Sequence, residues 1–90
     1  MAEPCRVVAL ISGNGSNLQT LIDAAKDDHY QIVAVLSNKP GVYGLERAKA
    51  AGIAHEHLSH KDFNSREAFD ETLRNRIDHY RPDLVVLAGF

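Results

Sequence analysis

Two kinds of hydrophobic pattern alternate along the chain. Short apolar runs rich in β-branched residues predict four strands, at residues 5–11, 31–36, 53–58 and 84–88. Between them, apolar residues recur every three or four positions and predict three helices, at about residues 16–25, 43–51 and 65–80. The first, second and fourth runs are almost continuously apolar, which is typical of strands that helices cover on both faces of a sheet.

Local signals mark where the helices begin and end. Ser16 and Gln19 have the spacing of a capping box, which predicts that the first helix starts directly after the first strand. Gly52 is placed to end the second helix. Asn64 and Glu67 form a cap pair that precedes the third helix. These signals agree with the helical periodicity at all three places.

The order of the elements predicts an α/β fold. Strands and helices alternate as β-α-β-α-β-α-β, and right-handed crossovers then give a Rossmann-like parallel sheet with helices on both faces. We expect the strand order 3-2-1-4, which is one half of a doubly wound domain. Residues 1–90 are expected to form a single half-domain, truncated after the fourth strand because the chain stops behind an apolar run. That strand would be an exposed edge, open to self-association or to a complementary C-terminal half.

Composition excludes several classes of protein. Ten basic and twelve acidic residues leave a formal charge of −2 at pH 7, so no basic surface for nucleic acid is expected. Cys5 is the only cysteine, which excludes a disulfide framework and a cysteine-built zinc site. No apolar run is as long as a membrane span, and residues 1–4 do not have the pattern of a signal peptide. We therefore expect a cytoplasmic protein that binds neither nucleic acid nor membrane.

The segment between the first strand and the first helix, SGNGSN at residues 12–17, carries the clearest chemistry. Its two glycines allow a tight turn and a close approach to a ligand. The helix that begins there offers N–H groups and a partial positive charge to an anion. We predict that Gly15, Ser16 and Asn17 bind a phosphate monoester. The alternative interpretation is a tight turn followed by a well-capped helix.

This glycine loop differs from two nucleotide-binding motifs. Leu18 stands where a dinucleotide motif has its third glycine, and the second strand runs into Ser37 and Asn38 instead of an acid that binds a ribose hydroxyl. The glycines are not followed by lysine and a hydroxyl residue, which excludes a nucleoside triphosphate P-loop. Since the winding reverses between the first and fourth strands, we expect the ligand in a crevice between the glycine loop and the end of the fourth strand. Phe90 there either packs against a flat ring or is an ordinary core residue.

Other polar residues give weaker signals. His55 and His57 share one face of the third strand, where two imidazoles could meet a metal ion, but we favour an exposed edge strand. Arg66 opens the third helix, where a cation is unfavourable, so it either binds a ligand carboxylate or is solvated. Lys39 and Arg47 are expected at solvated surfaces. No nucleophile, base and orienting group can be assembled, and we expect no catalytic residue in these ninety positions.

Five motifs in order resemble the opening half of the phosphoribosylglycinamide formyltransferase family: LISGNGSNLQ at 10–19, SNK at 37–39, GLERA at 44–48, SRE at 65–67 and LAGF at 87–90. The similarity extends from Cys5 to Phe90. It implies transfer of a formyl group from 10-formyltetrahydrofolate to the amine of glycinamide ribonucleotide, in purine biosynthesis and without a metal.

The resemblance also implies roles for single residues. The glycine loop would hold the ribose phosphate of the substrate, Arg66 would contact the folate, and Leu87 and Phe90 would begin the folate pocket. The family's catalytic asparagine, histidine and aspartate follow this segment, so the ninety residues alone are expected to be inactive. Two alternatives remain: a non-catalytic module that binds a phosphorylated metabolite, and a structural half that needs a complementary chain.

Overall fold

The alternation of strands and helices is present along the whole of the described chain. The computed structural model describes residues 4–13, 15–25 and 30–88. Its elements are β1 (Cys5–Ile11), α1 (Ser16–Ala25), β2 (Tyr30–Ser37), α2 (Tyr43–Ala50), β3 (Ala54–His57), the 3-10 turn η1 (His60–Asp62), α3 (Arg66–His79) and β4 (Leu84–Leu87). The predicted element order is confirmed, and β1 has the predicted bounds.

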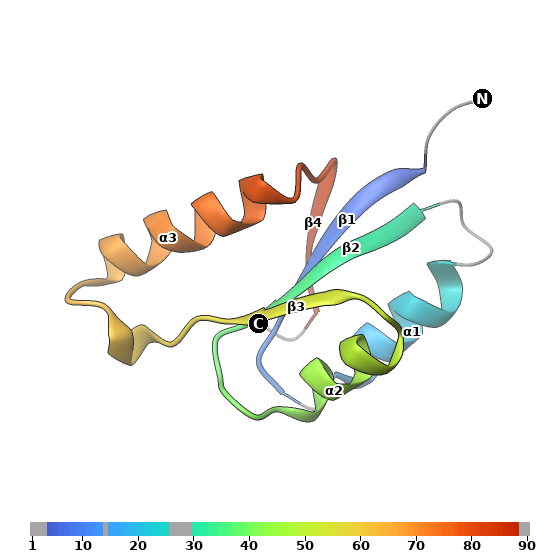
Figure 1. Ribbon diagram of the computed structural model, residues 1–90, viewed down its shortest axis with the longest axis horizontal. Coiled ribbons are helices and arrows are strands. Elements are labelled where there is room, and N and C mark those ends of the chain that lie inside the picture. The colour runs from blue at the N-terminus through green and yellow to red at the C-terminus, as the bar shows by residue number, and fades with distance from the viewer. Residues whose placement is uncertain (1–3, 14, 26–29, 89–90) are drawn as a thin grey trace.

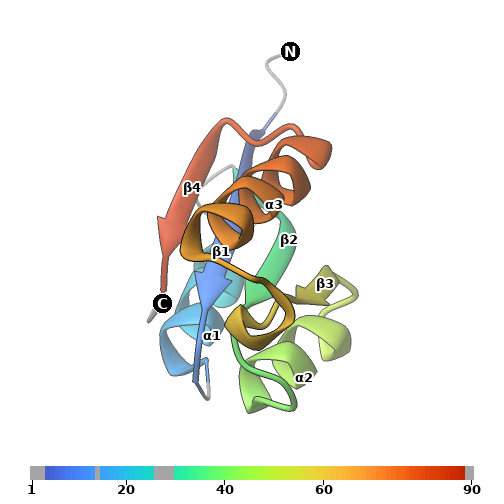
Figure 2. The ribbon, with the colours of Figure 1, turned by 90° about the vertical axis from the view of Figure 1, so that its left-hand side faces the viewer.

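The four strands form one parallel sheet in the order β3-β2-β1-β4, as predicted. Helix α3 lies on one face of the sheet, and α1 and α2 lie on the other (Figure 1, Figure 2). Because β1 is central and pairs with β2 and β4, the loop that follows it opens at the middle of the carboxyl edge. This is the edge at which open parallel sheets bind their ligands.

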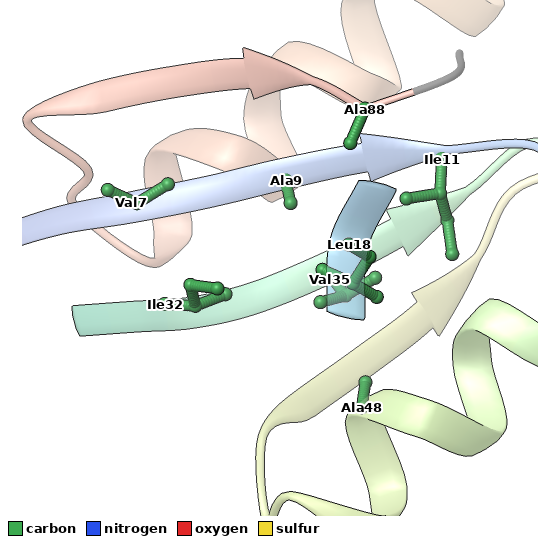
Figure 3. Close-up of a cluster of buried hydrophobic side chains, with 8 residues drawn as sticks. All are labelled: Val7, Ala9, Ile11, Leu18, Ile32, Val35, Ala48 and Ala88. Atoms are coloured by element: carbon green, nitrogen blue, oxygen red, sulfur yellow. The ribbon is translucent and has the colours of Figure 1, made fainter. Parts of the chain in front are cut away.

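The central strands bury both of their faces. Against α1 and α2, a first cluster gathers small and branched side chains (Figure 3): Val7, Ala9, Ile11, Leu18, Ile32, Val35, Ala48 and Ala88. A second cluster contains Val8, Leu10, Ala34 and Leu36, against which Leu73 and Ile77 of α3 and Tyr80, the residue that follows it, pack. Burial on both faces explains why β1 and β2 show no polar alternation.

A bulge in β2 sets which side chains reach each cluster. Val7 pairs with Ile32, but Val8 pairs with Ala34, so Val33 is an extra residue on β2. The bulge lets Ile32 enter the first cluster while Ala34 enters the second. The apolar run therefore fits the sheet although its residues do not alternate strictly.

Strand β4 differs from its predicted burial. Leu84, Val85 and Leu87 are 52%, 39% and 67% exposed. Val85 and Leu87 pair with Val8 and Leu10 and so share the face on which α3 packs. The prediction that helices cover β4 on both faces is therefore wrong within the described residues, because α3 packs over β1 and β2 instead. The predicted exposed edge at β4 is confirmed.

The cap of α1 lies one residue before the predicted one. The amide of Gln19 donates to the carbonyl oxygen of Gly15 at 2.8 Å, so the first helical hydrogen bond closes on Gly15. The side chain of Gln19 bonds to Asp23 and Arg47. The predicted capping box on Ser16 and Gln19 is wrong. The side chain of Gln19 does not reach back to the start of the helix, because it is hydrogen-bonded to Asp23 in α1 and to Arg47 in α2.

The residue that caps the start of α3 differs from the predicted one, whereas the residue that ends α2 is the predicted one. Ser65, and not Asn64, caps α3, since its side chain accepts from the amide of Ala68 at 3.1 Å. Gly52 ends α2 as predicted, with a φ of 72° and an amide that donates to the carbonyl of Lys49 at 3.1 Å. A glycine is favoured there because other residues are strained at positive φ.

A polar link joins α3 to β3. Arg76 donates from Nε and Nη2 to the two carboxylate oxygens of Glu56, at 2.9 and 2.8 Å, and the hydroxyl of Tyr80 donates to the same carboxylate. The bonds from Arg76 and Tyr80 lower the pKa of the Glu56 carboxyl below its usual value of 4.5, although partial burial opposes them. The sequence patterns did not indicate this pairing. Its hydrogen bonds are directional, so they orient α3 on the sheet in a way that its apolar packing does not.

The variant Glu56→Gln tests this link. Because the folded-state pKa of Glu56 is lowered, the ionised carboxylate stabilises the fold above its unfolded-state pKa near 4.5. That stabilisation is lost as the pH falls through the lower folded-state pKa. We expect the variant to melt a few degrees lower at neutral pH and to lose less stability than the parent below pH 4.5. Thermal melts across pH measure both effects, and equal effects from Glu71→Gln, on the exposed side of α3, would contradict the assignment.

Candidate functional site

The glycine loop leads from the carboxyl end of β1 into the first turn of α1. Gly13, Ser16 and Asn17 are exposed, whereas Gly15 is buried. A methyl group at Gly13 would have no atom within 4 Å. Gly13, Ser16 and Asn17 are therefore accessible from solvent, and ligand binding by this loop stays a prediction.

The first turn of α1 presents amides that a helix cannot use itself. Gln19 is the first residue whose amide donates within the helix, so the amides of Asn17 and Leu18 precede the helical ladder. The partial positive charge of the helix end lies at the same place. An exposed Asn17 side chain adds a further donor beside these amides. The arrangement has the chemistry of an anion site.

Gly15 contacts another part of the protein. It has a φ of 80°, and a Cβ on it would lie 2.6 Å from the Cα of Gly44 in α2. The side of Gly15 that lacks a side chain therefore faces the backbone of α2 and not a ligand. The sequence predicted a tight turn and a close approach to a ligand here; the positive φ agrees with the turn, and packing against Gly44 is a further reason for a glycine.

The predicted folate residues lie at other parts of the carboxyl edge. Leu87 is the last residue of β4 and is 67% exposed. Arg66 is the exposed first residue of α3, and Figure 1 shows the start of α3 well away from the loop between β1 and α1. Phe90 lies outside the described residues. The start of α3, with Arg66, therefore lies apart from the glycine loop (Figure 1), while β4 and β1 are neighbours in the sheet.

The histidines of β3 occupy an exposed edge. His55 and His57 are both exposed, and Nδ1 of His55 lies 3.1 Å from the carbonyl oxygen of Ile53. Within residues 4–13, 15–25 and 30–88, no three histidine, cysteine or acidic residues are grouped as metal ligands. In that same part of the chain, no helix has the length and apolar character that crossing a membrane needs.

Known proteins resemble this chain over nearly all of its length. The family model described as "Formyl transferase" matches residues 5–90. The chain belongs to the formyl transferase family. The phosphoribosylglycinamide formyltransferase of Escherichia coli is 56% identical over 86 residues, which cover 93% of this chain and 41% of that protein. The trifunctional purine biosynthetic protein adenosine-3 of Drosophila melanogaster is 55% identical over 89 residues, which cover 94% of this chain and 7% of that protein.

A solved formyltransferase has the same fold in this part. The structure of the phosphoribosylglycinamide formyltransferase from Coxiella burnetii in complex with CHES superposes with a TM-score of 0.94 at 50% identity, over 98% of this chain and 42% of that one. The chain therefore spans less than half the length of these relatives. It matches the part of the formyltransferase fold that holds the glycine loop.

In the part of the chain that the structure describes, two cavities were found whose walls do not include the glycine loop. One of about 500 Å³ lies at the carboxyl ends of β2 and β3, between residues 38–42 and 59–61, and includes Lys39 and Lys61. A larger one of about 600 Å³ lies between α1 and α2 on the side of the first residues of β2. The larger cavity lies away from the carboxyl edge of the sheet. The candidate anion site is therefore identified from the glycine loop and not from the size of a cavity.

The sequence analysis missed two residues that shape this loop. Gly44 is buried in the first turn of α2, and Arg47, predicted at a solvated surface, is half-buried. A glycine inside a helix weakens that helix by about 1 kcal/mol relative to alanine, so its presence signals a packing constraint. Nothing in the helical periodicity of α2 indicated that the partner is the glycine loop, because the contact joins two separate elements.

The variant Gly15→Ala tests the contact with α2. Alanine is strained at a φ of 80°, at about 1–2 kcal/mol, and its Cβ would also meet the Gly44 backbone at 2.6 Å. We expect the free energy of unfolding to fall by more than about 2 kcal/mol in urea denaturation.

The matched control is Gly41→Ala. Gly41 also has a positive φ, of 63°, but a Cβ there would meet nothing within 4 Å. It carries the conformational strain without the clash, so a loss of about 1 kcal/mol is expected. Equal losses from the two variants would show that the approach to Gly44 contributes nothing.

Proposed function

We propose that this chain is the substrate-phosphate half of a phosphoribosylglycinamide formyltransferase. The complete enzyme would transfer a formyl group from 10-formyltetrahydrofolate to the amine of glycinamide ribonucleotide, in purine biosynthesis. The observation that carries the proposal is the open glycine loop, which leads into α1 at the carboxyl end of the central strand. The names of the E. coli and Coxiella relatives support the same assignment.

In this proposal, Gly15, Ser16 and Asn17 hold the ribose phosphate. Gly15 provides the left-handed turn that starts the helix. Ser16 and Asn17 form its exposed first turn, where amides and short polar side chains donate to an anion. A phosphate monoester carries two negative charges near neutral pH, so it gains from the helix dipole as well as from the hydrogen bonds.

The folate side of the proposal uses the rest of the carboxyl edge. Arg66 would bind a carboxylate of the folate through its guanidinium group. Leu87 and Phe90 would begin an apolar pocket for the flat ring of the folate. These three assignments follow from the resemblance alone, with exposure of Arg66 and Leu87 as the supporting observation.

The proposed mechanism is direct transfer. The amine of glycinamide ribonucleotide attacks the formyl carbon, polar groups stabilise the resulting oxyanion, and a proton passes from the amine to the folate nitrogen that leaves. The resemblance places the groups for this step after Phe90. This chain would contribute anchoring, since fixing the phosphate positions the amine, and correct positioning can lower a barrier by roughly 7–11 kcal/mol at the extreme.

The variant Asn17→Asp separates binding from stability. A carboxylate in the first turn of α1 favours the helix dipole by about 0.3–1 kcal/mol, but it repels a phosphate. We expect the Kd for glycinamide ribonucleotide to rise about tenfold or more while the thermal midpoint stays level or rises. Calorimetric titration measures the Kd, and Asn75→Asp, the same change at an exposed position of α3, is the control. Equal Kd values for the parent, Asn17→Asp and Asn75→Asp would show that the loop does not bind the phosphate.

The exposed edge of β4 supports a second part of the proposal, namely that a complementary C-terminal half pairs there. We expect this chain alone to give no formyl transfer, and to give transfer when mixed with the remaining segment of the E. coli relative. Leu84→Lys, at a 52% exposed edge position, should reduce transfer in the mixture, whereas Asp70→Lys on the exposed side of α3 should not. Transfer by the chain alone would contradict the first expectation, and the absence of transfer in the mixture would contradict the second.

Binding of phosphorylated metabolites without binding of folate would favour the alternative function, a non-catalytic module.

A further inference from the structure

The first turn of α2 is in direct backbone contact with the glycine loop. The amide of Gly44 donates to the carbonyl oxygen of Gly13 at 3.3 Å. A Cβ on Gly44 would lie 2.4 Å from Cδ1 of Ile11, 3.1 Å from the Gly13 oxygen and 3.3 Å from Cα of Gly15. Helix α2 thus touches the end of β1 and both described glycines of the loop at once. A loop held in this way has little freedom to rotate its peptide groups.

Arg47 extends this contact by one helical turn. Its Nη1 donates to Oε1 of Gln19 in α1 at 3.2 Å, and its guanidinium carbon lies 4.7 Å from the centre of the Tyr43 ring. Its Cδ would lie 3.2 Å from a Cβ on Gly15. The amide group of Gln19 is oriented in turn by Asp23, to which its Nε2 donates at 3.0 Å.

Arg47 therefore joins the two helices that flank the loop. Its alkyl part lies beside Gly15, its charged end is stacked on Tyr43, and its hydrogen bond reaches the first turn of α1. A planar guanidinium stacks on a ring and donates in fixed directions, whereas a lysine ammonium is a compact point charge without that planar fork. Loss of the guanidinium would release α1 from α2 beside the loop.

The effect on binding follows from preorganisation. Backbone amides bind an anion well only when they already point at it, because reorienting them on binding costs free energy. A brace that holds the loop therefore acts on the anion without touching it.

We infer that Gly44 and Arg47 are positioning residues for the anion loop: they hold Gly13, Gly15 and the start of α1 in the conformation that binds phosphate. The inference rests on the proposed phosphate site. It adds that α2, through these two residues, sets how tightly the loop binds phosphate.

The test is a titration of this chain with inorganic phosphate, followed by the amide NMR signals of the loop, together with thermal melts. Arg47→Met keeps the alkyl length and removes the guanidinium, and Arg74→Met is the matched control on the exposed side of α3. We expect Arg47→Met to raise the Kd for phosphate about tenfold, as for the loss of one charge-assisted hydrogen bond, well below its melting midpoint. Arg74→Met should bind like the parent.

If Arg47→Met melts at a lower temperature but binds phosphate like the parent, Arg47 is merely structural and the inference is overturned. If Arg47→Lys restores the parent Kd, charge alone suffices and positioning by the stacked guanidinium is overturned. If the parent itself does not bind phosphate, the proposed function fails instead.

A second variant decides the matter if Arg47→Met does not fold. Gly44→Ala combined with Ile11→Val removes the 2.4 Å clash with Cδ1 but keeps the 3.1 Å approach to the Gly13 oxygen, so the loop must shift. We expect weaker phosphate binding than for Ile11→Val alone. Equal Kd values for these two proteins would overturn the role of Gly44.

Discussion

The carboxyl edge of the sheet depends on a place where two backbones touch. Gly15, at the start of α1, and Gly44, in the first turn of α2, approach each other so closely that a Cβ on either would meet the other's backbone. Because neither has a side chain, α2 can lie against the end of β1. The same contact holds the turn that presents the loop to solvent, so packing and the proposed anion binding share one constraint.

This constraint explains how a site without a cation in its loop can suit an anion. The loop residues are glycine, serine and asparagine, and the positive potential comes from aligned peptide groups at the start of α1. Peptide dipoles are useful only in a fixed orientation, and the fixed orientation comes from α2. The half-buried Arg47 serves the site best as a brace between the two helices, because its guanidinium is already stacked on Tyr43 and bonded to Gln19.

The two faces of the sheet are stabilised differently. On the face of α1 and α2, small residues and backbone contacts allow close packing around the loop. On the other face, α3 is held by an apolar stripe and by the ion pair of Arg76 with Glu56 at the β3 side. Because α3 packs over β1 and β2, Val85 and Leu87 of β4 stay exposed on this face within the described residues. β4 is the neighbour of β1, the strand that leads into the glycine loop, so the proposed phosphate and folate contacts would lie at one edge of the sheet.

The sequence by itself determined the order of the elements, the parallel sheet in the order β3-β2-β1-β4 and the chemical character of the loop. Periodicity, turn residues and helix ends are local properties, and the rules for crossovers then leave few topologies. It misplaced the caps at Ser16 and Asn64 by one residue: the first helical hydrogen bond of α1 closes on Gly15, and Ser65 caps α3. Only the tertiary structure decided that Gly15 meets Gly44, that Arg47 is bonded to Gln19 and that β4 is uncovered. Each of these depends on the distance between segments far apart in the chain, which no local pattern records.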